Sequence, residues 1–172
     1  MGVMKVEIRK AVLRDAAQLL EVIQNADAFD SVIVQLGEVG LTVERIEKWM
    51  KENEETMTLF VAVKEDRIVG YLMVQRGKLK STAHCGTIAI GVHSDVRGEG
   101  VGTDLFEQMH DWARKEKFHR LDMMVLTNNV KGIFLFRKMG YTIESTKQDA
   151  MFIDGRYIDE YLMVRFIDQE NE

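Results

Sequence analysis

The segment Val92-His-Ser-Asp-Val-Arg-Gly-Glu-Gly-Val-Gly-Thr103 places three glycines between a β-rich run and an amphipathic helical pattern. Glycine has no Cβ, so successive backbone N–H groups can point into one concave nest. The N-terminus of the following helix adds a partial positive charge. Arg97 and the hydroxyl of Thr103 supply further donors. The segment therefore predicts a site for an anionic group such as a pyrophosphate, and a loop used only for chain reversal is the alternative.

Two common phosphate-binding motifs are excluded. The G-x-G-x-x-G fingerprint requires glycine at the position of Thr103, and G-x-x-x-x-G-K-[ST] occurs nowhere in the 172 residues. The sequence therefore favours neither dinucleotide binding on a Rossmann fold nor a P-loop nucleotidase. A nucleotide-binding regulatory domain is correspondingly disfavoured.

The regions on both sides of this segment alternate between strand and helix periodicity, which predicts one mixed α and β domain. No clear period spans Asp27 to Gly40. The patterns predict strands at Val6–Ile8, Leu59–Val63, Ile68–Val74, Ala83–Val92 and Leu121–Val125, a final pair of strands around Asp154 and Gly155, and helices starting near Asp15 and Thr42 and covering Thr103–Lys117 and Asn129–Met139.

Length and composition limit the class of protein. The 172 residues suit a single domain over 1–172, since domains usually have roughly 100 to 200 residues. The net charge of −5 disfavours a nucleic-acid partner. No apolar run reaches the roughly 20 residues of a membrane span, and the single Cys85 permits no internal disulfide, so we expect a cytoplasmic protein without a membrane partner. The four histidines lack metal-ligand spacing, which predicts no metal site.

Two blocks together resemble the GNAT superfamily of N-acetyltransferases. Arg97-Gly-Glu-Gly-Val-Gly102 matches its loop Q/R-x-x-G-x-G/A, and a second block follows after a helix and a strand. That block consists of Asn129, Gly132, Phe136, Lys138, Gly140 and Tyr141. The likeness extends over nearly the whole chain. It implies a single α/β domain of α+β type, with a central mixed, mostly antiparallel sheet splayed between strands four and five and flanked by about four helices.

The resemblance also implies acetyl-CoA as co-substrate and assigns its binding residues. Backbone groups of Ile90, Gly91 and Val92 would meet the pantetheine arm, and Asn129 would contact it from the other side. Phe136 would pack on the cofactor. The pyrophosphate would be held by Arg97, Gly98, Glu99, Gly100, Val101, Gly102 and Thr103. Dimers are common in the family, so a homodimer is an expected assembly.

The catalytic groups stay unassigned. Related enzymes often carry a tyrosine acid where this chain has Phe136, which leaves Tyr157 and Tyr161 as unranked substitutes. The predicted strand Ala83–Val92 has no carboxylate, and its titratable side chains, those of His84 and Cys85, are more simply structural. Acidic residues of the irregular N-terminal segment would suit a cationic acceptor; they are Asp27, Asp30 and Glu38.

These observations predict an acetyl-CoA-dependent N-acetyltransferase. The acetyl group would pass to a primary amine of a small molecule or a protein N-terminus by direct attack in a ternary complex. The alternative is a non-catalytic acyl-CoA-binding or sensor module, because the usual tyrosine is missing. The identity of the amine is left open by the sequence.

Overall fold

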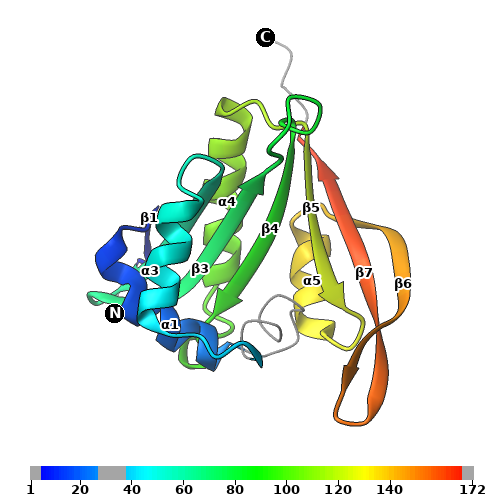
Figure 1. Ribbon diagram of the computed structural model, residues 1–172, viewed down its shortest axis with the longest axis horizontal. Coiled ribbons are helices and arrows are strands. Elements are labelled where there is room, and N and C mark those ends of the chain that lie inside the picture. The colour runs from blue at the N-terminus through cyan, green and yellow to red at the C-terminus, as the bar shows by residue number, and fades with distance from the viewer. Residues whose placement is uncertain (1–4, 27–37, 168–172) are drawn as a thin grey trace.

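The computed structural model describes residues 5–26 and 38–167, which form a seven-stranded sheet flanked by helices (Figure 1). The sheet order is β1-β2-β3-β4-β5-β7-β6. The strands are β1 (Glu7–Lys10), β2 (Met57–Lys64), β3 (Arg67–Arg76), β4 (Cys85–Val92), β5 (Arg120–Leu126), β6 (Thr142–Ile153) and β7 (Arg156–Phe166). The α-helices are α1 (Ala16–Asn25), α3 (Val43–Glu52), α4 (Val101–Lys115) and α5 (Val130–Lys138). The predicted mixed, mostly antiparallel sheet is confirmed.

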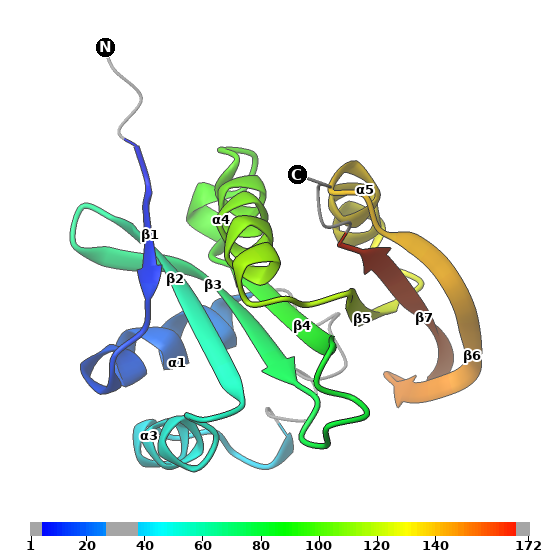
Figure 2. The ribbon, with the colours of Figure 1, turned by 90° about the horizontal axis from the view of Figure 1, so that it is seen from above.

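The helices form two layers, with α4 and α5 on one face of the sheet and α1 and α3 on the other (Figure 2). Each face has its own apolar cluster. Leu72, Leu105 and Met123 belong to the cluster under α4, whereas Leu19 and Val61 belong to the cluster under α1 and α3. Alternate residues of the central strands therefore bury opposite faces, which explains why their sequences are almost continuously apolar. Among the described residues, no helix is both long and apolar enough to cross a membrane.

Tight turns fix the register of the two long hairpins. Glu65 and Asp66 join β2 to β3 with φ values of 51° and 60°, and Asp154 and Gly155 join β6 to β7 with φ values of 50° and 75°. Two successive left-handed residues define the turn whose twist matches a two-residue hairpin. The second hairpin folds back so that β7 lies between β5 and β6.

The sheet opens between β4 and β5, as expected from the resemblance. These strands are parallel and pair only over Cys85–Thr87 and Arg120–Asp122. Beyond those residues they diverge, and Figure 1 shows the resulting V between β4 and β5. Backbone groups of Ile90–Val92 on this edge of β4 consequently have no ladder partner in β5.

Candidate functional site

The glycine loop exposes its backbone to open space. Gly98 and Gly100 have φ values of 77° and 84°, a region that L side chains rarely adopt. A Cβ added at either glycine would meet no atom within 4 Å among the described residues. Steric crowding by the chain therefore does not account for these two glycines. Their left-handed backbone turns the loop into α4 and leaves room for a ligand directly above it.

Helix α4 presents its positive end at this loop. Gly100 is the residue before the helix, and the first intrahelical bond runs from Asp104 N to Gly100 O at 3.0 Å. The N–H groups of Val101, Gly102 and Thr103 precede that ladder, and all three residues line the adjacent cavity. Unpaired N–H groups and the helix dipole together favour an anion here.

The cavity occupies about 400 Å³ between the diverging strands and α5. Its lining includes every predicted cofactor residue except Glu99. The Glu99 carboxylate forms an ion pair with Lys64 Nζ at 2.7 Å, at the turn between β2 and β3, so its side chain does not line the cavity. The predicted residues in the lining are Ile90, Gly91, Val92, Arg97, Gly98, Gly100, Val101, Gly102, Thr103, Asn129 and Phe136.

Helix α5 forms the second wall, and Asn129 fixes where it starts. The Asn129 side-chain oxygen accepts a hydrogen bond from Gly132 N at 3.0 Å and caps the helix. A Cβ at Gly132 would lie 2.5 Å from the Asn129 amide nitrogen, so this cap requires glycine. Phe136 is 5% exposed and packs edge-on against Phe106 of α4, with ring centroids 5.8 Å apart. The second sequence block therefore builds a rigid wall.

The third glycine of the loop brings the two walls together. A Cβ at Gly102 would lie 2.8 Å from a Leu135 methyl carbon, so glycine is needed for α4 to approach α5 closely. Gly102 thus has a packing role in addition to its place in the cavity lining.

Several residues of the cavity lining were not predicted from the sequence. Lys131 and Lys138 of α5 add two cations to that of Arg97, and the exposed Phe134 adds an aromatic ring. Lys138 belongs to the second sequence block, but Lys131 and Phe134 carried no signal beyond their places on a helix. Three cationic side chains around one cavity suit a ligand with several phosphate charges.

The fold separates the titratable side chains that the sequence analysis weighed for catalysis. His84 and Cys85 lie at the start of β4, at the opposite end of the strand from Ile90–Val92. Tyr157 is 68% exposed near the tip of the β6–β7 hairpin, whereas Tyr161 pairs with Val125 of the cavity wall. Of the acidic candidates, Glu38 is exposed, and Asp27 and Asp30 lie outside the described residues. Within 5–26 and 38–167, no cluster of His, Cys, Asp and Glu could hold a metal.

A buried polar network supports the α5 wall from behind. His110 of α4 contacts the Tyr141 hydroxyl through Nε2 at 2.9 Å, and Arg165 donates to His110 Nδ1 at 2.9 Å. Arg165 also donates to the Met139 carbonyl, just after α5, at 2.7 Å. Burial, with the positive charges of Arg165 and Arg114 adding to it, lowers the pKa of His110 to about 3. Neutral His110 thus links α4, α5 and β7.

The fold and the cationic cavity suit a ligand that carries phosphate groups, and comparison with known proteins gives the class of protein. Residues 8–162 match the family model described as an acetyltransferase (GNAT) domain. The chain therefore belongs to the GNAT family of acetyltransferases, and it is an enzyme of the acyltransferase class. Members of this family use acetyl-CoA.

Individual relatives agree with this assignment. L-amino acid N-acetyltransferase AaaT of Escherichia coli (strain K12) is 28% identical over 109 residues, which are 61% of this chain and 65% of the relative's length. A GNAT-family acetyltransferase from Streptococcus pneumoniae superposes with a TM-score of 0.83 at 26% identity, covering 95% of this chain and 100% of the other. The structure of yncA from Salmonella typhimurium with its cofactor acetyl-CoA gives a TM-score of 0.81 at 19% identity, covering 97% and 96%.

Proposed function

We propose that this protein transfers the acetyl group of acetyl-CoA to a primary amine of a small molecule or a protein N-terminus, by direct attack in a ternary complex. One observation carries the proposal: the open loop at Gly98 and Gly100 lies at the N-terminus of α4, beside the gap between β4 and β5. The name of the curated relative, an L-amino acid N-acetyltransferase, makes L-amino acids the first acceptors to test.

The residues present fit acetyl-CoA. The N–H groups at the start of α4, together with Arg97, suit the pyrophosphate, and Lys131 and Lys138 suit further phosphate charge. The unpaired edge of β4 at Ile90–Val92 can exchange backbone hydrogen bonds with the amides of the pantetheine arm. When bound, acetyl-CoA supplies an activated thioester, so the protein must orient it, provide a neutral amine and protonate the leaving thiolate.

Ligand binding is tested first by thermal shift and calorimetry with acetyl-CoA. A ligand that binds only the folded state stabilises it by about 2.7 kcal/mol at a hundredfold excess over Kd. The Gly100→Val variant should raise Kd at least about 100-fold, since the loss of two charge-assisted hydrogen bonds corresponds to roughly 3 kcal/mol or more. No stabilisation of the wild type by acetyl-CoA or CoA would refute the proposal.

Gly155→Val is the matched control for Gly100→Val. Gly155 has a φ value of 75° and open space above it, like Gly100, but it lies in the β6–β7 turn. Both variants therefore carry similar backbone strain, and only Gly100→Val introduces a side chain into the proposed pyrophosphate site. Equal weakening of acetyl-CoA binding in the two variants would assign the effect to strain.

Turnover distinguishes an enzyme from a carrier-binding module. Release of CoA thiol is measured with the twenty L-amino acids, with spermidine and with a peptide that has a free N-terminal alanine. Acetylation of one of these amines supports the proposed function. Tight binding of CoA without turnover on any of them would favour the acyl-CoA-binding module, for which the phenyl ring at position 136 is the supporting observation.

A further inference from the structure

Glu160 of β7 is a buried carboxylate that the fold does not use. The residue is 5% exposed, and its Oε1 atom has no hydrogen-bond partner among the described residues. Lys147 lies directly opposite on β6, yet its ammonium group is not a hydrogen-bond partner of Glu160 Oε1. Buried carboxylates are ordinarily paired because their desolvation is costly. An unpaired one on a well-packed strand therefore indicates a functional role.

Strand register places Glu160 on the face of the sheet that carries α1 and α3. The pairing of β5 with β7 runs without irregularity from Arg120 opposite Phe166 to Leu126 opposite Glu160. Side chains alternate between faces along a strand, so Glu160 and Leu126 share a face with Asp122. Asp122 accepts a hydrogen bond from Thr87 of β4 at 3.1 Å. The intervening residue Val125 faces the α4 and α5 side instead, where it lines the cavity.

The same register places Glu160 at the level of the cofactor cavity. Thr87 of β4 is paired with Asp122 of β5, and the two strands are parallel. Gly91 and Leu126 lie the same number of residues beyond this pair, so they are at the same level on the two strands. Gly91 lines the cavity on one side of the gap, and Leu126 ends β5 on the other, directly beside Glu160. The carboxylate thus lies next to the open end of the V, on the face opposite the glycine loop.

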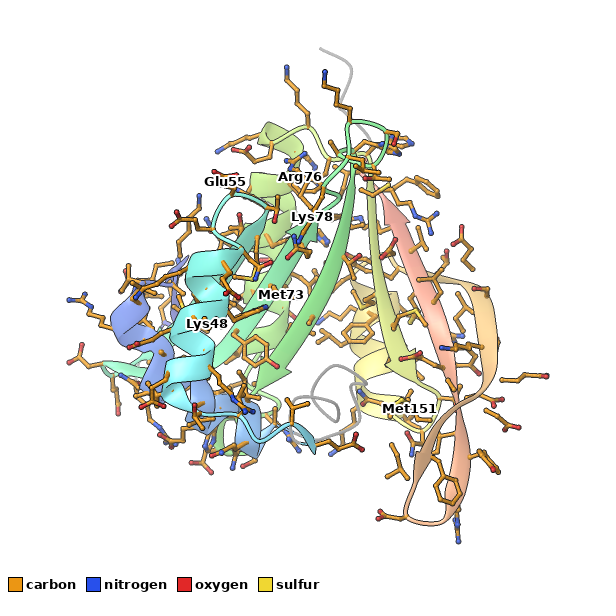
Figure 3. All side chains as sticks on the ribbon, viewed as in Figure 1. Lys48, Glu55, Met73, Arg76, Lys78 and Met151 are labelled. Carbon is orange, nitrogen blue, oxygen red and sulfur yellow. The ribbon has the colours of Figure 1, made fainter. Side chains whose placement is uncertain are left out.

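The wall across the gap has a matching polar group. Tyr71 of β3 pairs with Gly91, and a Cβ at Gly91 would lie 2.5 Å from the Tyr71 ring, so this ring covers Gly91 on the same face of the sheet. Figure 3 views this face, with Met73 of β3 on one side of the gap and Met151 of β6 on the other. A substrate amine that enters over this face would meet a carboxylate on the β5–β7 side.

We propose that Glu160 is the general base that binds the acceptor ammonium and takes one proton from it. This inference rests on the proposed function. The neutral amine then attacks the thioester carbonyl carbon, an N–C bond forms and the C–S bond breaks. The second nitrogen proton passes to the CoA thiolate, which leaves as the thiol, while Glu160 returns its proton to water. An acidic group at this place also selects cationic amines, and it supplies the carboxylate that β4 lacks.

The test compares the wild type with Glu160→Gln, using an amine that the wild type acetylates. General base catalysis contributes about 10² to 10⁴, so kcat/KM for the amine should fall by at least about 100-fold. Calorimetric Kd for acetyl-CoA should stay unchanged, because the pyrophosphate site lies on the other face. If Glu160 is the base, kcat of the wild type should fall at acidic pH, and this fall should be absent in Glu160→Gln, which has no carboxylate at this position.

The melting temperature distinguishes a catalytic role of Glu160 from a structural one. Glutamine removes an unpaired buried charge at almost constant volume, so Glu160→Gln should melt at the same temperature as the wild type or higher. Glu160→Asp, which withdraws the carboxylate by one methylene, should lose at least about tenfold in kcat/KM and keep the acidic fall of kcat. Glu7→Gln, an exposed glutamate of β1 at the far edge of the sheet, is the control and should change neither property.

Two outcomes would refute the role of Glu160 as the general base, and a third would refute the proposed function on which that role rests. A kcat/KM for Glu160→Gln within about threefold of the wild type would remove Glu160 from catalysis while the proposed function stands. A large activity loss with an unchanged pH profile and a lower melting temperature would make Glu160 structural. A wild type that binds acetyl-CoA but acetylates no amine would refute the proposed function and, with it, this assignment.

Discussion

Protonation of His110 should destabilise the protein in acid, and the size of the effect follows from its surroundings. His110 is 3% exposed, accepts a hydrogen bond from Arg165 at Nδ1 and contacts the Tyr141 hydroxyl through Nε2. Arginine can only donate, so the proton of the neutral ring resides on Nε2, which donates to the tyrosine oxygen. A second proton would have to reside on Nδ1, facing the Arg165 guanidinium. The folded state therefore strongly disfavours the imidazolium.

The direction and size of the change in unfolding free energy follow from the pKa of His110, which folding lowers from 6.5 to about 3. Between these two pH values His110 binds more protons in the unfolded chain than in the folded one. The contribution of neutral His110 to stability is therefore fully present well above pH 6.5 and is lost as the pH falls toward 3. One pKa unit corresponds to about 1.4 kcal/mol, and pH 5 lies about 1.5 units below the unfolded value, so the loss from pH 7 to 5 is about 2 kcal/mol.

The assay is urea unfolding at pH 7 and pH 5 for the wild type and for His110→Gln, whose amide can accept from Arg165 and donate to Tyr141 without titrating. Other groups titrate alike in both proteins and cancel in the comparison. We expect the wild type to lose about 2 kcal/mol more than His110→Gln over this interval. Equal losses in the two proteins would show that His110 does not titrate differently on folding and would refute the reasoning.

Three further substitutions test the site and its scaffold. Phe136→Tyr adds a hydroxyl where related enzymes carry their acid, and it should raise kcat by about tenfold or less; a fall above a hundredfold with acetyl-CoA affinity preserved would contradict the role of this ring as an apolar wall. Gly86→Ala places a Cβ 2.9 Å from three core side chains and should cost about 1–3 kcal/mol in urea unfolding. Asp15→Asn weakens a pair whose oxygens lie 2.7 and 3.0 Å from the Arg9 guanidinium, costing about 2 kcal/mol at pH 7. Since Arg9 lowers the pKa of Asp15 below 3.8, that difference should shrink in acid, and a pH-independent difference would argue against it.

The glycine loop and the start of α5 were predictable from the sequence because the interactions that form them are local. Gly98 and Gly100 adopt a backbone conformation that glycine favours, and they directly precede the helix whose N–H groups they expose. Asn129 and Gly132 form a cap within one helical turn. Such interactions depend on residues close together in the chain, so their spacing alone identifies them.

The position of Glu160 was decided only by the tertiary structure. Glu160 lies next to the end of β5 because β7 inserts between β5 and β6, and an antiparallel register then sets it beside Leu126. Shifting that register by one residue would send the carboxylate to the other face of the sheet. Likewise, Glu99 lies in the predicted loop, but its carboxylate pairs with Lys64, which is distant in sequence. The Glu99 side chain therefore does not line the cavity. Strand order and long-range charge pairs depend on contacts between distant segments, and no local spacing encodes them.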